Sequence, residues 1–277
     1  MVHAMTEPSF QRMPTHFGTT TGPRQGPDGK PFDWHDNPRR TTAVVRFVTD
    51  ADALATLLPP ELTLVGEPVV TVEWAALEQL AWLAGRGYNM LGVKCMARFA
   101  GTQDDVTGEF LAVLWENLAD PIISGREELG FNKVYAELPM PERSTSTFST
   151  SASWLKHRFF DLKLEGLEPV TATAPARPQQ PASAGTLHVK HMPRTGAWGE
   201  TDARYCTLTP STGSHYRREA RWEGRGQCRF IASSWEQLPT LSHIVNPLAQ
   251  LPLRQWLGAS VEQGVGGKDL SDQRRLT

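Results

Sequence analysis

The sequence predicts an α+β fold that is mainly antiparallel β with a few short helices. Short segments of alternating apolar and polar residues are numerous, and Gly, Pro, Asp and Asn interrupt them, which is typical of strands joined by turns. Long amphipathic helical stretches are few. The chain has 277 residues, enough for one large domain or two small ones and for a substantial core.

The composition argues against several classes of protein. A formal net charge of −2 gives no sign of a nucleic-acid or membrane-surface partner. No segment approaches the roughly 18 consecutive apolar residues that span a bilayer, and the N-terminal residues contain no apolar stretch of signal-peptide type. We therefore expect a cytoplasmic protein. Cys95, Cys206 and Cys228 form no CxxC pair, so we expect reduced, buried thiols.

The N-terminal half begins with an expected flexible arm and continues with strands. Residues 1–31 are polar and rich in Gly and Pro. Phe32 and Trp34 are expected to anchor this arm to a domain that spans residues 32–260. Asp50 is placed to cap a short helix. The expected strands are residues 41–49, 68–77, 88–99 and 109–115.

The C-terminal half alternates strands with polar connections. Residues 139–150 are expected to form a polar loop, and residues 166–185 a connection rich in Pro and Ala. Helical character is clearest after Pro239. Residues 261–277, rich in Gly and charge, are expected to form a flexible tail. The remaining expected strands are residues 151–164, 186–192, 203–209 and 226–233.

Residues 121–138 carry the main functional hypothesis. Ser124 to Glu127 has the pattern of a capping box at a helix start, and Gly130 is placed to end that turn in a left-handed conformation. An alternating segment then begins with Lys133. A lysine at a strand start is usually a solvent-facing charge. The alternative is that a rigid turn delivers Lys133 as an amine nucleophile that forms a Schiff base with a carbonyl substrate.

This alternative sets a chemical requirement, because a nucleophilic amine must be neutral. An ordinary lysine has a pKa of about 10.4 and is almost fully charged at neutral pH. Burial in an apolar pocket or a neighbouring cation can lower the pKa of the lysine amine enough to make it neutral.

Other familiar motifs are absent. The sequence has no GxGxxG after a strand, no GxxxxGK[ST] and no GxSxG, which argues against a nucleotide site and a serine-hydrolase elbow. His188 and His191 lie three apart on an expected strand, so they point to opposite faces and are poorly placed to share a metal. A structural role is favoured for both, and we expect no metal site.

One segment resembles a known family. Gly125-Arg126-Glu127, followed by five residues and Lys133, resembles the catalytic-lysine segment of the acetoacetate decarboxylase family. Acetoacetate decarboxylase is an example of an enzyme with an activated lysine. Three further segments resemble the family in the same order and extend the resemblance, in pieces, over about residues 32–260. They are NPRRTTAVVRFVTDADAL, PELTLVGEPVVTVEWAAL with Glu73, and EQLPTLSHIVNPLAQLPLRQWLGAS.

The resemblance implies a fold and a chemistry. It implies a large antiparallel sheet closing toward a barrel, an imine at Lys133, Arg40 as the active-site arginine, and a homo-oligomer. No cofactor is required, because the protonated imine is itself the electron sink. Two departures stand out. The family's second lysine is replaced by Val134, and the glutamate that it carries two residues after a tyrosine is replaced by Met90, which follows Tyr88.

Both departures disfavour decarboxylation more than they disfavour Schiff-base chemistry. We therefore expect a lyase that acts on a small keto acid by aldol addition and dehydration with a pyruvate-like substrate. The alternatives are a β-keto acid decarboxylase and a non-catalytic protein that binds a small ligand. The expected catalytic residues are Lys133, Tyr88 and Glu116, and the expected substrate-binding residues are Arg40, Met90 and Trp82. Each of four residues also has a purely structural interpretation: a core aromatic for Tyr88, a turn cap for Glu116, a surface ion pair for Arg40 and a core or wall position for Trp82.

Overall fold

One sheet of fourteen strands organises the part of the chain that this computed structural model describes, residues 22–170 and 181–277. The helical segments are η2 (Gly22–Arg24), α1 (Ala51–Ala55), η3 (Ala81–Leu83), α2 (Ala119–Ser124), the π-helical turn η4 (Gly125–Leu129) and α3 (Ser242–Ala249). The strands are β1 (Arg39–Val48), β2 (Leu62–Leu64), β3 (Val69–Leu80), β4 (Arg86–Ala100), β5 (Asp105–Glu116), β6 (Lys133–Tyr135), β7 (Glu142–Arg143), β8 (Thr147–Trp154), β9 (His157–Pro169), β10 (Gly185–Pro193), β11 (Thr201–Pro210), β12 (Arg217–Phe230), β13 (Gln255–Val265) and β14 (Arg274–Arg275).

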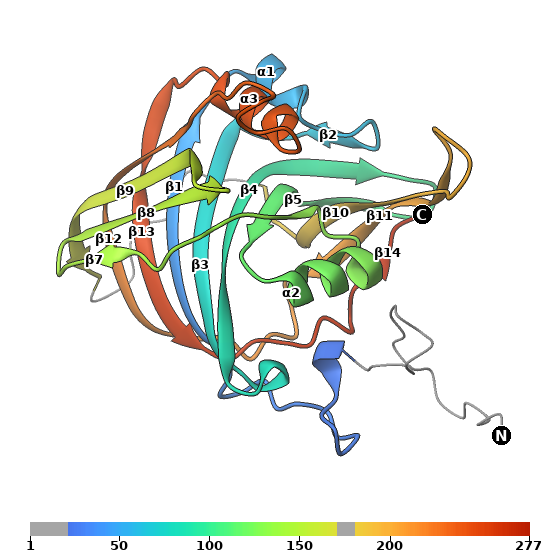
Figure 1. Ribbon diagram of the computed structural model, residues 1–277, viewed down its shortest axis with the longest axis horizontal. Coiled ribbons are helices and arrows are strands. Elements are labelled where there is room, and N and C mark those ends of the chain that lie inside the picture. The colour runs from blue at the N-terminus through green and yellow to red at the C-terminus, as the bar shows by residue number, and fades with distance from the viewer. Residues whose placement is uncertain (1–21, 171–180) are drawn as a thin grey trace.

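The sheet is almost wholly antiparallel and curls toward a barrel. Its main path runs β14-β11-β10-β5-β4-β3-β1-β13-β12-β9-β8-β7, with β2 added on β4 and β6 on β5. Among the described strands, the only parallel pairs are β5 with β6 and β5 with β10. The long strands β1, β3, β4 and β13 form a strongly bent wall (Figure 1). Hydrogen bonds do not join the two ends of the path, so the curled sheet stays open. The predicted fold class is confirmed.

Alternation along the central strands separates a packed face from an open face. Trp74, Leu91 and Trp115, on β3, β4 and β5, are fully buried in the core. Glu73 and Glu116 precede or follow these tryptophans directly, so their side chains point to the opposite face. That open face carries the candidate site.

A β-bulge widens the open face. Gly92 lies opposite Leu114, but Lys94, two residues further along β4, lies opposite Leu111. The extra residue on β5 turns both leucines, which are three apart in the sequence, toward the side of Gly92 and Lys94.

Most strands agree with the sequence prediction. The strands expected at 41–49, 68–77, 88–99 and 109–115 correspond to β1, β3, β4 and β5, and those expected at 186–192 and 203–209 correspond to β10 and β11. The helix expected after Pro239 is α3. The three cysteines are free, as predicted, although Cys228 is only half-buried.

Several predicted boundaries are wrong. Residues 139–150 hold β7 and the start of β8, and the single strand expected at 151–164 contains the hairpin turn between β8 and β9. The strand expected from residue 226 begins at Arg217. These segments are rich in polar residues because one face of each strand meets solvent, so they lack a clear hydrophobic pattern.

The two chain ends also differ from expectation. Residues 261–277 are not a flexible tail, since β13 continues to Val265 and β14 pairs with β11. Part of the predicted arm, residues 22–31, forms η2 and a bridge between Gln25 and Pro31. The rest of the arm and residues 171–180 lie outside the described residues.

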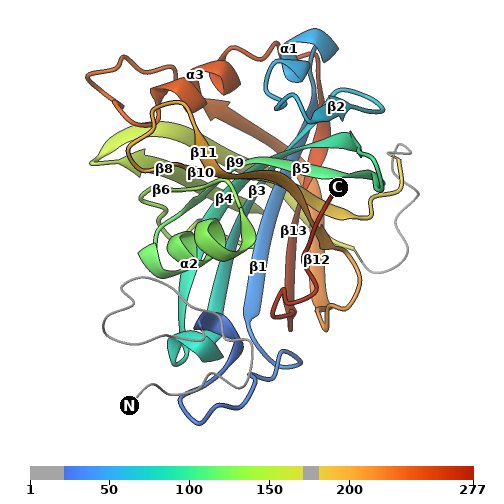
Figure 2. The same cartoon turned by 90° about the vertical axis from the view of Figure 1, so that its right-hand side faces the viewer.

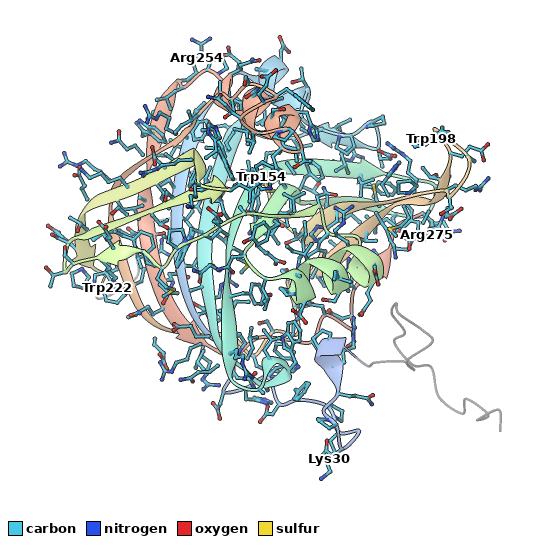
Figure 3. The ribbon with its side chains drawn as sticks, in the orientation of Figure 1. Lys30, Trp154, Trp198, Trp222, Arg254 and Arg275 are labelled. Atoms are coloured by element: carbon cyan, nitrogen blue, oxygen red, sulfur yellow. The ribbon has the colours of Figure 1, made fainter. Side chains whose placement is uncertain are left out.

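The two ends of the curled sheet are covered by different segments. α1, β2 and α3 gather at one end, and residues 22–38 cover the other (Figures 1 and 2). Asp50 stands at the start of α1, but its carboxylate accepts two hydrogen bonds of 2.7 Å from Arg254 and does not cap the helix. The β10–β11 hairpin extends away from the body and carries the fully exposed Trp198 (Figure 3). No helix in the described ranges is long and apolar enough to cross a membrane.

Candidate active site

A cavity of about 340 Å³ lies on the open face of β3, β4 and β5. Residues from the two ends of the chain, Trp34 and Gly266 among them, form part of its wall. A wider groove of about 810 Å³ over β8, β9 and β12 is lined by none of the residues predicted for the site. The chemistry predicted from the sequence therefore belongs to the smaller, better enclosed cavity.

Lys133 reaches this cavity from the first position of β6. The residue is buried, with 6% of its surface exposed. Its amine donates a hydrogen bond of 2.9 Å to the carbonyl of Pro121 and forms an ion pair of 2.9 Å between Nζ and Glu116 Oε1. The ring of Phe131 lies below the amine, with 5.2 Å between Nζ and the ring centroid. Lys133 is thus a buried amine at a cavity and not a solvent-facing charge.

The turn before Lys133 explains how the side chain is placed. Gly125 leaves room for it, because a Cβ at this position would lie 2.6 Å from Cδ and Cε of Lys133. Gly130 ends the turn in the left-handed region with φ of 75°, as the sequence predicted. Arg126 braces the far side through a 2.8 Å hydrogen bond from Nη1 to the Lys133 carbonyl.

The capping box predicted at Ser124 is wrong. The helix begins five residues earlier, at Ala119, and Ser124 lies at its last position. The Ser124 hydroxyl donates to the carbonyl of Asp120 at 3.0 Å and forms no cap. A helical turn thus runs from Ala119 through η4 and ends at Gly130, one residue before Phe131.

Glu116, at the end of β5, is fully buried beside the amine. Burial raises the pKa of its carboxyl above the usual value, and the Lys133 charge opposes that rise. Its Oε2 has no hydrogen-bonding partner among the described residues. Met90 lies directly opposite Glu116 in the β4–β5 register. The acid that the family resemblance leads us to expect at Met90 is therefore found one strand away, on the same face.

A second charged cluster contains Arg40, Glu73 and Lys94. Arg40 Nη2 lies 2.7 Å from Oε1 of Glu73, and Lys94 Nζ lies 3.0 Å from Oε2. Burial would raise the pKa of the Glu73 carboxyl, but the charges and hydrogen bonds of Lys94 and Arg40 outweigh it and lower the pKa to about 2. Burial opposes the charge on Lys94, yet Glu73 raises the pKa of its amine. Glu73 and Lys94 therefore both stay ionised across the working pH range.

Tyr88 lies between the two charged clusters. Burial raises the pKa of its phenol well above the usual value, the Glu116 charge adds to this, and Arg40 opposes it. The phenol therefore keeps its proton and can donate a hydrogen bond. Met90 and Trp82 line the cavity nearby, on the η3–β4 side.

His188 forms another part of the wall. Its imidazole is fully buried and stacks on Phe131, with 3.9 Å between ring centroids. Burial, with the charges of Lys133 and Lys94, lowers its pKa to about 3, so the ring is neutral. The Phe131 ring thus lies next to both the Lys133 amine and a neutral imidazole.

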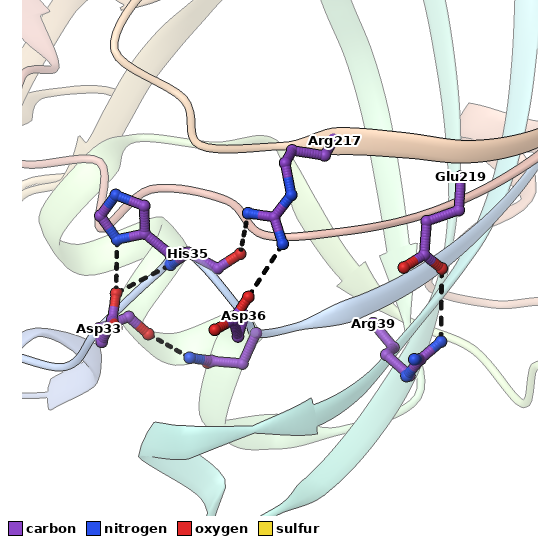
Figure 4. Close-up of polar contacts among 7 residues, drawn as sticks. Asp33, His35, Asp36, Arg39, Arg217 and Glu219 are labelled. Carbon is purple, nitrogen blue, oxygen red and sulfur yellow. Dashed lines mark hydrogen bonds and ion pairs between the residues drawn. The ribbon is translucent and has the colours of Figure 1, made fainter.

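Residues 33–39 cover the cavity and are fastened to β12. Arg217 donates to the His35 carbonyl and to the Asp36 carboxylate, each at 2.9 Å (Figure 4). Trp34, predicted to anchor the N-terminal arm, lies in the wall of the cavity.

The structure brings all six residues predicted for the site to this one cavity: Lys133, Tyr88, Glu116, Arg40, Met90 and Trp82. Sequence reasoning missed Lys94 and His188. Lys94 had a usable signal, since it continues the alternation of Tyr88 and Met90 along β4. His188 had none, because only the stacking on Phe131 distinguishes it from an ordinary core histidine.

The fold and the cavity define a class of protein in which a curled β sheet presents a buried lysine to a cavity. The chain belongs to the acetoacetate decarboxylase family, whose family model matches residues 12–266. No curated protein matches the chain.

Solved structures share the fold at low sequence identity. An acetoacetate decarboxylase from Legionella pneumophila subsp. pneumophila str. Philadelphia 1 is 18% identical, with a TM-score of 0.62, over 89% of this chain and 88% of that chain. An acetoacetate decarboxylase-like enzyme from Sphingomonas wittichii RW1 is 17% identical, with a TM-score of 0.60, over 87% and 93%. The enduracididine biosynthesis enzyme MppR, complexed with pyruvate, is 15% identical, with a TM-score of 0.58, over 89% and 95%.

Replacing Gly125 with Ala should displace the Lys133 amine without unfolding the protein. Gly125 has helical backbone angles that alanine adopts freely, but the new Cβ would occupy the space of the Lys133 side chain. We expect borohydride trapping of a keto acid on Lys133 to slow at least about tenfold, since small displacements of reacting groups have effects of this size or larger. Ile123→Ala, at an exposed position of α2, is the control. Equal trapping rates in both variants would contradict this placement of Lys133.

Glu73→Gln should produce a pH-dependent loss of stability. The folded-state pKa of Glu73, about 2, is below its usual value of 4.5, so its ionisation stabilises the folded state above about pH 4.5 and this contribution disappears as the pH falls toward 2. At roughly 1.36 kcal/mol per pKa unit, the contribution is about 3 kcal/mol. Denaturant unfolding should therefore show a difference between wild type and Glu73→Gln that is largest above pH 5 and shrinks toward pH 2. The exposed Glu67→Gln serves as the control, and a difference that does not vary with pH would refute the ionised cluster.

Proposed function

We propose that this protein is a Schiff-base lyase that acts on a small keto acid. The observation that carries the proposal is the buried Lys133 amine, 2.9 Å from a buried carboxylate and at the wall of a cavity. The family membership supports it, because Lys133 lies in the segment that resembles the family's catalytic lysine.

Glu116 is the natural proton acceptor for the amine. In the first step its carboxylate takes a proton from the Lys133 ammonium, and the freed lone pair attacks the ketone carbon. The alkoxide formed by this attack takes one proton from the new C–N nitrogen to give the neutral carbinolamine. The protonated Glu116 then returns its proton to the carbinolamine hydroxyl, which leaves as water and gives the iminium ion. The raised pKa of Glu116 suits this exchange, because a carboxylate with a higher pKa is a better base.

The other residues have roles that follow from their chemistry. The Arg40 guanidinium is suited to bind the substrate carboxylate, and the Tyr88 phenol to donate a hydrogen bond to it. Met90 and Trp82 provide an apolar wall for the remaining carbons. The iminium ion acidifies the adjacent carbon, and loss of that proton gives an enamine that can attack an aldehyde.

Aldol addition and dehydration is the reaction we favour over decarboxylation. Met90 puts a thioether, and not a carboxylate, at the position where the decarboxylases carry their glutamate, and Val134 replaces their second lysine. MppR is described in complex with pyruvate and with the condensation product of pyruvate and imidazole 4-carboxaldehyde. A β-keto acid decarboxylase is the second candidate, and the family name supports it.

Borohydride trapping tests the imine. After incubation with pyruvate or acetoacetate and reduction, peptide mapping should locate a mass adduct on Lys133, and Lys133→Met should abolish it. The exposed Lys163→Met should leave it unchanged. Carbon dioxide release from acetoacetate would favour the decarboxylase, and condensation of pyruvate with an aldehyde would favour the aldolase. The absence of an adduct with every keto acid would leave a non-catalytic binding protein.

Glu116→Gln tests the proton acceptor. The amide keeps the shape of the side chain but cannot accept the lysine proton, so we expect imine formation at neutral pH to fall about 10²-fold or more. The rate should recover in alkaline solution, where hydroxide removes the proton instead. Glu116→Asp should retain part of the activity. A pH–rate profile identical to that of wild type would exclude Glu116 from proton transfer.

A further inference from the structure

Lys94 shares Glu73 with Arg40 at the inner wall of the cavity. The two oxygens of Glu73 are divided between them, with 2.7 Å from Oε1 to Arg40 Nη2 and 3.0 Å from Oε2 to Lys94 Nζ. One carboxylate therefore fixes two cationic groups on either side of itself. Both cations line the cavity that contains the Lys133 amine.

Both cations have N–H donors that no residue in the described ranges accepts. A lysine amine has three N–H donors and an arginine guanidinium has five. Within the described ranges, Glu73 is the only hydrogen-bond partner of Lys94 Nζ. Arg40 uses Nη2 for Glu73 and Nε for Thr42. The Nη1 group of Arg40 has no partner among the same residues. Lys94 Nζ and Arg40 Nη1 thus each retain donors for a further acceptor.

The charges of the Arg40–Glu73–Lys94 cluster are unbalanced in favour of an anion. Lys133 and Glu116 neutralise each other, whereas Arg40 and Lys94 share the single charge of Glu73. The other charged residues in the wall are Lys268, which is paired with Asp272, and Asp269, whose carboxylate accepts hydrogen bonds from the backbone amide and the hydroxyl of Ser271. Glu109 acts on Lys94 through space but does not line the cavity. A monoanion bound at the cluster would compensate its one excess positive charge, and a partly buried charge is stable only when it is compensated.

An apolar surface lies between this cluster and Lys133. Glu73, Gly92, Leu114 and Lys133 form one row across β3, β4, β5 and β6. Gly92 has no side chain, and a Cβ there would lie 3.2 Å from Leu111 and 3.3 Å from Leu114. The two leucine side chains therefore pack over Gly92 and give the cavity an apolar wall between the charged cluster and the amine.

We propose that Lys94 and Arg40 together bind the carboxylate of the keto acid and make the site selective for anionic carbonyl substrates over neutral ketones and aldehydes. This inference rests on the proposed function and adds to it a specificity-determining residue, Lys94. Arg40 supplies the planar fork, Lys94 supplies a point charge, and Glu73 holds both in place.

The test compares an acid with a neutral ketone. Pyruvate and acetone are each trapped on Lys133 with borohydride in wild type, Lys94→Met, Lys94→Arg and the exposed Lys163→Met. In Lys94→Met, the half-saturating concentration of pyruvate should rise about tenfold or more, while acetone trapping stays within about twofold. Lys94→Arg should restore most of the pyruvate affinity, and Lys163→Met should behave as wild type. Thermal denaturation confirms that each variant is folded.

The contrary outcomes are distinct. Equal losses for pyruvate and acetone would make Lys94 a structural residue and overturn the inference, as would no loss for either. A second arm measures binding of butyrate, a carboxylate without a ketone, by calorimetry. If wild type forms no imine but binds butyrate in a manner that depends on Lys94, the proposed reaction fails and the carboxylate site stands. If butyrate binding is independent of Lys94, the carboxylate site fails whatever the imine experiment gives.

Discussion

The buried ion pair between Lys133 and Glu116 is the interaction around which the site is built. Burying an ammonium and a carboxylate together is rarely a net gain in stability, because the loss of hydration is large for each ion. Here both groups are nearly inaccessible to water, and one oxygen of Glu116 lacks a hydrogen-bonding partner among the described residues. Such a pair is weak evidence for a stabilising role and stronger evidence for a chemical one. Proton exchange within it yields a neutral amine beside a neutral acid, which is the state that imine formation needs.

The position of that pair depends on the sheet and on two glycines. β6 joins β5 in parallel, which sets Lys133 opposite Leu114, two residues along β5 from Glu116 and on the same face of the sheet. Gly125 opens the space that the lysine side chain occupies, and Gly92 leaves room for the Leu111 and Leu114 side chains to pack over β4. The cavity is therefore defined as much by missing side chains as by those that line it.

The sequence predicted the local features well and the tertiary pairings poorly. The strand at Lys133 and the left-handed Gly130 follow from alternation and from the conformational freedom of glycine, so they were accessible without a structure. The capping box at Ser124 failed because the preceding residues, including Pro121, already belong to the helix. Proline is tolerated in a first helical turn, and a pattern that restarts after it is easily mistaken for a new helix.

Long-range pairings account for the rest of what was missed. Glu73 and Lys94 are 21 residues apart, and only the β3–β4 register brings them together. The flexible tail was predicted from Gly and charge, yet β13 is an inner strand between β1 and β12, where polar side chains such as Glu262 bond across the sheet to Arg221. Composition alone does not distinguish a solvated tail from a strand whose charges are paired in this way.

The position of the carboxylate bears on the choice of reaction. Glu116 stands on β5, directly opposite Met90 on β4, which occupies the position of the decarboxylases' glutamate. A carboxylate on β4 would lie in the open part of the cavity, beside Tyr88, where it would repel the substrate carboxylate and favour its departure as carbon dioxide. On β5 the charge of Glu116 is instead paired with the Lys133 amine. In the binding mode that we propose, Arg40 and Lys94 hold the substrate carboxylate, and Glu73 pairs with both of them. A substrate carboxylate that is bound by two cations and is not repelled by an acid is stabilised in its ground state, so its loss becomes harder. The same arrangement leaves the enamine free to attack a second carbonyl compound, which is the chemistry that the placement of Glu116 favours.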